Sequence, residues 1–377
     1  MGMVSERFSN RVTEMFRIQH PIFAFSNEPR VVAAVSRSGG LGVLGTGTCS
    51  SEELDRRLDG LDTEVPGRYG IDILFPVITE ELDVGEIERQ IPASHREFVD
   101  KIVTQLGIGA LSDEGRRLYG EGHLLTNRWA AELASVALAH RICAFATALG
   151  PVPGDIFSAL RERDIKVIGM TGSPGQARRQ LAAGADVIVA QGTEAAGHVS
   201  DITTMVLVPQ VVDAVSPTPV LAAGGIASGR QMAASLALGA EGVWTGSMWL
   251  LSQEHGLDAV LRDRLLAASS RDTVRTGALT GKPVRMLRNK WYDLWESDAA
   301  PAPLPAPLQG ILVRPALSAA LEHHVGDAMG TPAGQVVGMM NSVRPVAEMI
   351  ESMTAECLTA LDVAGRQAAR EPGKISR

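Results

Sequence analysis

Two glycine-rich segments of the chain are suited to hold an anion. The first has the sequence GGIASG at Gly224–Gly229 and stands before a segment with helical spacing, and the second is the pair Gly246-Ser247. Glycines let backbone N–H groups approach an anion closely, and a helix N-terminus adds a favourable dipole. Either segment alone could be an ordinary turn. Because both follow short apolar runs, the pair predicts a site for a phosphate-bearing ligand.

A third segment contains the histidine that is best placed to do chemistry. Residues 190–200 read AQGTEAAGHVS, so His198 ends a run of small residues. An imidazole that titrates near neutrality can take a proton from carbon or nitrogen, return one, or hold an anion. A lone histidine is more often structural than catalytic, but this setting makes His198 the histidine best suited to such chemistry. The other histidines stand before the first apolar run, in the charged middle of the chain or near helices, where we expect solvated or capping roles: His20, His95, His123, His140, His255, His323 and His324.

Eight short apolar runs, rich in Val, Ile and Leu, must position these segments. Continuous runs of this kind are typical of strands buried on both faces of a parallel sheet. Helical patterns separate them at roughly the spacing of βα units, and eight such units favour an α/β fold of the (β/α)8 TIM-barrel type over an open doubly wound sheet. The predicted strands are Pro21–Phe25, Leu41–Leu44, Gly70–Phe75, Ile142–Ala146, Lys166–Met170, Asp186–Gln191, Pro219–Ala223 and Gly242–Thr245.

One gap between strands is too long for a single helix. The stretch from Pro76 to His140 holds helical and charged segments, and we interpret it as an insertion after strand 3. A Pro/Ala segment at 299–308 acts as a spacer. The amphipathic segments Leu317–His324 and Val343–Leu361 are expected to return and pack beside the insertion as a helical cap. The expected boundaries are residues 1–76 and 141–298 for the barrel, 77–140 and 309–370 for the cap, and 299–308 for the linker.

The composition narrows the class of partner. The 377 residues include 35 Lys and Arg against 43 Asp and Glu, a net charge of −8, without a basic stripe. This balance argues against a nucleic-acid or anionic-membrane partner and favours a small molecule. Cys49, Cys143 and Cys357 match no disulfide or zinc spacing, and we expect no metal site. No apolar stretch reaches the length of a membrane span and no targeting segment is evident, so we expect a cytoplasmic protein.

The two chemical segments resemble the signature of a known family. Ala190–His198 is similar to the QGxEAGGH motif of the nitronate monooxygenases, formerly called 2-nitropropane dioxygenases, and Pro219–Leu250 resembles their GGI-x-dGR…AALALGA…GT stretch. FMN-dependent enoyl-ACP reductases share both motifs. Weaker similarity extends over Ile18–Phe25, Gly39–Gly45, Tyr69–Leu74 and Gly334–Val346, the last of these resembling a recurrent C-terminal helix.

The resemblance implies an FMN-dependent barrel enzyme and assigns roles to particular residues. The phosphate of FMN would lie on the glycine loops, and the flavin ring on residues at the ends of strands 1, 3 and 6, with His198 as the catalytic imidazole. The residues implied to bind FMN are Ala24, Phe25, Asp72, Gln191, Ala196, Gly197, Gly224, Gly225, Gly246 and Ser247.

The chain departs from the family pattern at several of these positions. Asp72 stands where the family has Asn, and a carboxylate only accepts hydrogen bonds whereas an amide also donates. Ala196 replaces Gly beside the ring, and Ser247 replaces Thr with its hydroxyl retained. The segment 24–27 differs from the usual APM loop of strand 1, and 143–147 lacks the SFxFG signature of strand 4.

We expect the enzyme to oxidise alkyl nitronates, and neutral nitroalkanes if His198 acts as a base, with O2 to a carbonyl compound and nitrite. Two alternatives remain open: an NAD(P)H-dependent FMN reductase of enoyl thioesters, and a flavin-binding protein without catalysis. The oligomeric state is also open, a homodimer being one option. At most half of the candidate pocket walls should face the substrate; these are Phe25, Phe75, Phe145, Met170, Trp244 and Trp249.

Overall fold

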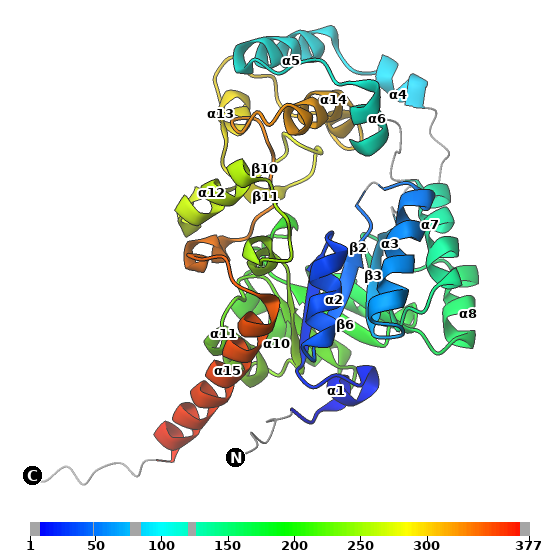
Figure 1. The fold of residues 1–377 in the computed structure, drawn as a ribbon, viewed down its shortest axis with the longest axis vertical. Coiled ribbons are helices and arrows are strands. Elements are labelled where there is room, and N and C mark those ends of the chain that lie inside the picture. Colours follow the sequence, from blue (N-terminus) through cyan, green and yellow to red (C-terminus); the bar gives the residue numbers. More distant parts are fainter. Residues whose placement is uncertain (1–7, 48, 76–83, 120–125, 370–377) are drawn as a thin grey trace, which may run out of the picture.

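The computed structural model describes residues 8–47, 49–75, 84–119 and 126–369. Eight parallel strands close a barrel in the order β1-β2-β3-β4-β5-β6-β8-β9, with helices around it and a helical cap above it (Figure 1). All eight predicted strands and the barrel are confirmed. The strands are β1 (Ile22–Ser26), β2 (Leu41–Gly45), β3 (Tyr69–Leu74), β4 (Ala144–Ala148), β5 (Lys166–Thr171), β6 (Val187–Gln191), β8 (Val220–Ala223) and β9 (Gly242–Thr245).

Successive side chains of each strand point to opposite faces, and this alternation separates two cores. The outer core, between strands and helices, takes Ile22 and Ala24 of β1. The inner core fills the barrel and takes Phe23 of the same strand. Helix α1 (Arg11–Phe16) contributes Phe16 to this inner core, and its ring meets that of Phe23 edge-on at 5.1 Å. The barrel interior is therefore packed with side chains and closed at its N-terminal end.

In the described part of the chain, eight helices cover the barrel, and two of them were expected in the cap. Helix α7 packs on α3, α8 and β3, and α15 packs on α11 and α2. In place of a long helix, β9 is followed by the short 3-10 helix η1 (Ser247–Leu251). The gap that this leaves between α11 and α2 is covered by α15. The covering helices are α2 (Pro29–Arg37), α3 (Ser51–Glu64), α7 (Asn127–Ala139), α8 (Gly154–Glu162), α9 (Pro174–Ala182), α10 (Thr204–Val215), α11 (Gly229–Ala237) and α15 (Val346–Ala368).

The sequence-based cap boundaries are corrected by these contacts. Residues 127–139 and 346–368 belong with the barrel, because their buried faces join the outer core. On α15 this face consists of Val346, Ile350, Met353 and Cys357, spaced at helical intervals. An amphipathic pattern shows that a helix has a partner, but it does not show which partner.

The helical cap is built from two distant segments, and the second begins earlier than expected, because α13 (Lys290–Trp295) lies within the range assigned to the barrel from the sequence. The insertion provides α4 (Val84–Arg89), α5 (Ala93–Leu106) and α6 (Asp113–Tyr119), and the later segment provides α13 and α14 (Leu308–Glu322). Figure 1 shows these helices together at the top of the molecule. Helices α5, α13 and α14 share a core of their own, in which Ile102, Trp291 and Val313 are buried, and α4 and α6 pack on α14.

Further elements connect the barrel to the cap. A small antiparallel sheet, ordered β10-β11-β7, is built from β10 (Thr273–Thr276), β11 (Val284–Leu287) and β7 (Gly197–His198). Helix α12 (Ala259–Ala267) and the 3-10 helices η2 (Ser270–Asp272) and η3 (Gln335–Met339) complete this layer. Among the described helices, none combines the length and the apolar character that a membrane span requires.

Candidate active site

The loops after β6, β8 and β9 come together at the C-terminal mouth of the barrel. Gly224 and Gly225 follow β8 with φ of 92° and 72°, a backbone region that side chains rarely allow. A Cβ on Gly224 would lie 2.9 Å from the carbonyl oxygen of Gly192 in the loop after β6, so these two loops pack closely. A Cβ on Gly246, after β9, would instead meet no atom within 4 Å. Because Ala223 of β8 pairs with Trp244 of β9, the two predicted glycine loops leave neighbouring strands, and Gly246 faces free space.

Ser247 connects this mouth to the C-terminal segment. Its Oγ accepts a hydrogen bond of 2.8 Å from the backbone N–H of Gly334, which leaves the hydroxyl proton able to reach an anion. The N–H of Gln335 donates to the carbonyl of Glu194 at 3.0 Å. Residues 334–335 thus join the loops after β6 and β9. The segment 334–346 is not the continuous helix expected from the sequence, because only Gln335–Met339 is helical, as η3.

The N-terminus of α11 already holds an anion from the protein itself. Ser228 is the N-cap, and the carboxylate of Glu356 on α15 accepts from the N–H of Gly229 at 2.7 Å and from Arg230 at 2.8 Å. A negative side chain at this end of a helix is electrostatically favoured. The N-terminus of α11 is therefore already occupied by the carboxylate of Glu356.

Asp72 is a buried carboxyl group inside the barrel. It lies on β3 opposite Gly45 and Ala146, between neighbours whose side chains face the outer core. Asp72 is only 6% exposed, and its Oδ1 has no hydrogen-bond partner among the described residues. Burial raises the pKa of Asp72 to about 7, because a charged carboxylate is poorly solvated there. Near neutral pH this group is partly protonated, so it can donate a hydrogen bond as the Asn of the family pattern does.

His198 lies on β7, at the layer between barrel and cap. Its backbone pairs with Val284 of β11, and its Nε2 lies 3.0 Å from Oγ1 of Thr280. The residue is exposed, yet desolvation, followed by the positive charge of Lys282, lowers the pKa of His198. The imidazole is therefore held in its neutral form at neutral pH.

Among the residues expected to line the flavin ring, some face the barrel mouth, and Ala24 directs its side chain away from it. Gln191 continues the inward-facing positions of β6, and its Nε2 donates to the carbonyl of Ala196 at 3.5 Å. Gly197 has a φ of 72°, and a Cβ there would meet no atom within 4 Å. Ala24, in contrast, has its side chain in the outer core, so only its backbone can take part.

Three of the six candidate pocket walls face the inside of the barrel. Phe25, Met170 and Trp244 pack around the inner core, and the rings of Phe25 and Trp244 are 6.5 Å apart. The other three belong to the outer core and cannot touch a ligand at the mouth. These are Phe75, Phe145 and Trp249.

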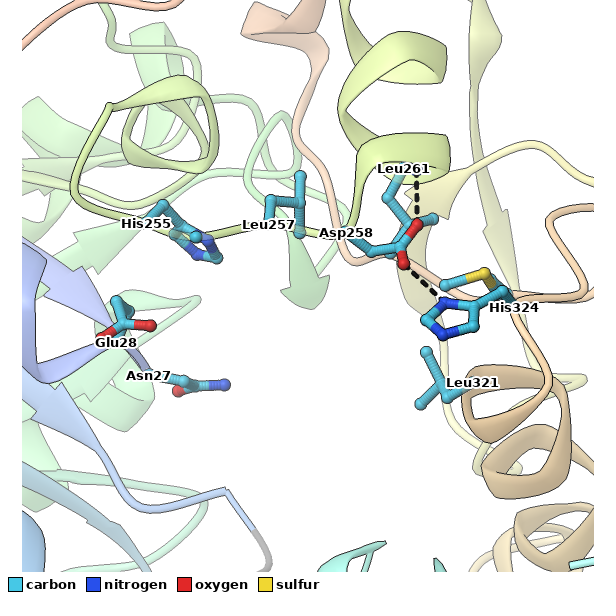
Figure 2. Close-up of a pocket in the computed structure, with 10 residues that line it drawn as sticks. Asn27, Glu28, His255, Leu257, Asp258, Leu261, Leu321 and His324 are labelled. Carbon is cyan, nitrogen blue, oxygen red and sulfur yellow. Dashed lines mark hydrogen bonds and ion pairs between the residues drawn. The ribbon is translucent and has the colours of Figure 1, made fainter.

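A cleft of about 330 Å³ separates the barrel mouth from the cap. Figure 2 shows Asn27, Glu28 and His255 on the barrel side, across from Asp258 and His324. Asp258 caps α12, and its carboxylate lies 2.7 Å from Nδ1 of His324. On the opposite wall, Nδ1 of His255 is buried without a hydrogen-bond partner among the described residues. The sequence did not point to this cleft, because its walls come from segments that are far apart in the chain.

The residues present at the mouth fit a flavin phosphate better than a metal. No group of three or more His, Cys, Asp or Glu residues in the described part of the chain could hold a metal ion. The orphaned Oδ1 of Asp72 and the free space beside Gly246 lie at the places where a ring edge and a phosphate were expected. A phosphate loop after the last two barrel strands is a recurrent feature of this fold.

A barrel with paired glycine loops and a histidine at its mouth is typical of the flavin-dependent TIM-barrel oxidoreductases. Within that class the chain belongs to the nitronate monooxygenase family, whose model matches residues 9–356. Membership implies a flavin cofactor and a small-molecule substrate.

Individual relatives agree with this assignment. The chain is 45% identical to “Putative monooxygenase Rv1533” of Mycobacterium tuberculosis over 92% of this chain and 96% of that protein. It is 33% identical to a “Probable nitronate monooxygenase” of Staphylococcus aureus, over 75% and 79%. A nitroalkane oxidase from Streptomyces ansochromogenes superposes with a TM-score of 0.77 at 26% identity, covering 94% and 99%. FabK from Thermotoga maritima superposes with a TM-score of 0.70 at 28% identity, covering 96% and 99%.

Proposed function

We propose that the protein is an FMN-dependent nitronate monooxygenase that converts alkyl nitronates and O2 into a carbonyl compound and nitrite. The observation that carries the proposal is the convergence of Gly224, Gly225, Gly246 and Ser247 with His198 at one mouth of a barrel of this family. We also propose a cytoplasmic location, as expected from the sequence.

The residues at the mouth would divide the work of holding the cofactor. Backbone N–H groups of the glycine loops and the hydroxyl of Ser247 would bind the phosphate. Asp72 would meet the polar edge of the ring from inside the barrel, and the backbone of Ala24 and Phe25 would pass beside it. Gln191, Ala196 and Gly197 would line the ring from the loop after β6. When bound, FMN supplies the oxidation of the nitronate and the reaction with O2.

His198 would act on the substrate through a hydrogen bond or a proton. A nitronate is an anion, and one charge-assisted hydrogen bond contributes about 1.5–3 kcal/mol, which aids binding but cannot supply catalysis alone. With a neutral nitroalkane, the same imidazole would accept the proton of the carbon next to the nitro group.

The decisive experiment combines the absorption spectrum with turnover. Purified protein should show a flavin band, or acquire one with added FMN, and should release nitrite from propionate-3-nitronate under air. His198→Ala should keep the flavin band and lose about a hundredfold or more in turnover, the scale of a positioned acid or base. Unchanged turnover would remove His198 from the mechanism, and a protein without flavin would refute the proposal.

A reductase of enoyl thioesters is the second candidate. The likeness to FabK, an enoyl reductase, covers nearly the whole chain and supports it. Anaerobic mixing with NADH or NADPH separates the two functions. Rapid bleaching of the flavin favours the reductase, and a flavin that stays oxidised favours the nitronate route. If neither a nitronate nor an enoyl thioester is turned over, the protein binds flavin without catalysis.

A further inference from the structure

The hairpin of β10 and β11 holds the loop that carries His198. Strand β11 places Val284 opposite His198 and Arg285 opposite Gly197. The Nε of Arg285 also donates to the carbonyl oxygen of Thr193 at 2.9 Å. The loop is therefore fixed by the hairpin on both sides of the short strand β7.

The turn of this hairpin reaches the imidazole itself. Oγ1 of Thr280 lies 3.0 Å from Nε2 of His198, 3.3 Å from the carbonyl oxygen of Lys282 and 3.3 Å from the N–H of Lys282. A hydroxyl group has a single proton to donate. If this proton goes to the carbonyl of Lys282, Oγ1 must accept the Nε2–H of His198. The lone pair of the neutral ring then lies on Nδ1.

The charges around the ring favour its neutral form. Lys282 is exposed and lowers the pKa of His198, in addition to desolvation. The other charged side chains on the packed elements have partners of their own. Glu194 accepts from the backbone and hydroxyl of Thr204, Arg275 pairs with Asp201 at 2.6 Å, and Arg285 donates to the carbonyl of Thr193.

We propose that Thr280 is a positioning residue that holds His198 in its Nε2–H tautomer, so that the lone pair of Nδ1 is free to accept the carbon-bound proton of a neutral nitroalkane. Lys282 assists by keeping the ring neutral. The proposal rests on the proposed function only in taking His198 as the group that meets the substrate; the tautomer itself is a property of this chain. The same hydroxyl also couples His198 to the cap, because the turn packs on the Pro/Ala segment at Leu304 and Ala306.

The first test measures the tautomer directly. In ¹⁵N-histidine-labelled, flavin-loaded protein, the signal of His198, assigned by its loss in His198→Gln, should show a protonated Nε2 and an unprotonated Nδ1 at neutral pH. Thr280→Val keeps the side-chain shape but removes the hydroxyl, and should give a mixture of tautomers. Thr280→Ser should restore the signature of the native protein. An unchanged tautomer in Thr280→Val would overturn the proposal, whatever reaction the enzyme catalyses.

The second test measures the consequence for turnover. With a neutral nitroalkane as substrate, Thr280→Val should lower kcat/KM roughly tenfold to a hundredfold, part of what a positioned base contributes, while Thr280→Ser stays close to the native value. Lys282→Gln should move the pH dependence of kcat/KM that reports His198 to higher pH, and Lys290→Gln, in the cap, should leave it in place. Equal losses in Thr280→Val and Thr280→Ser would also overturn the proposal. If Thr280→Val fails to fold, Thr280→Ala replaces it in both tests.

Discussion

The buried carboxyl group of Asp72 predicts how the stability of the protein depends on pH. The residue is 6% exposed inside the barrel, and burial raises its pKa from an ordinary 3.8 to about 7. Between these two values the folded protein binds a proton that the unfolded chain has lost. The stabilisation from this proton is complete below pH 4 and is lost as the pH rises through 7.

The size of the effect follows from the two pKa values. One pKa unit corresponds to about 1.4 kcal/mol, so ionising Asp72 in the folded protein costs on the order of 4 kcal/mol. Integrating between pH 5 and pH 8 gives a loss of about 2.5 kcal/mol in the free energy of unfolding. Asp72→Asn has nearly the same shape and no titrating proton. Any fixed cost of burying the amide shifts its stability equally at every pH.

The assay is urea denaturation of flavin-free protein at several pH values. The difference in unfolding free energy between native protein and Asp72→Asn should change by about 2.5 kcal/mol from pH 5 to pH 8, with the native protein losing stability at the higher pH. Asp298→Asn, which changes an exposed carboxylate, should follow the pH dependence of the native protein. Parallel curves for native protein and Asp72→Asn would refute the reasoning and mean that water solvates this carboxyl group.

Two further changes test the phosphate loop and an ion cluster outside the barrel. Gly246→Leu should leave the melting temperature of flavin-free protein nearly unchanged, because a Cβ there meets no atom within 4 Å. In a fluorescence titration, the same change should weaken FMN binding by more than tenfold, or about 1.4 kcal/mol. An unchanged affinity would place the phosphate elsewhere. His140 is buried, and although desolvation is the largest influence and lowers its pKa, hydrogen bonds of 3.0 Å to Asp55 and Asp62 and their charges outweigh it and raise the pKa. The resulting stabilisation is present below pH 6.5 and is lost as the pH rises through the raised pKa, so urea denaturation should show a larger destabilisation by His140→Gln at pH 6 than at pH 9; an equal loss at both would contradict it.

The linear sequence contained enough to predict the barrel and the loops that form its candidate site. Eight continuous apolar runs separated by helical patterns correspond to β1–β6, β8 and β9, because strands buried on both faces leave no polar alternation. Since parallel strands end at the same edge, the segments that follow β6, β8 and β9 had to meet there, and the glycines of the last two stood out by type alone. Each of these signals is local, and the repeated βα unit determines where in the barrel each loop lies.

Which face a side chain takes, and which partner a helix finds, were decided only by the tertiary structure. Phe25 and Phe145 stand at the ends of similar apolar runs, yet one faces the inner core and the other the outer core, because a shift of one residue along a strand reverses the face. The hydrogen bond between Thr280 and His198 joins residues 82 positions apart. The sequence determined the elements and the chemistry of their ends, while the contacts that orient His198, bury Asp72 and place α15 on the barrel arise from long-range packing, which no local pattern contains.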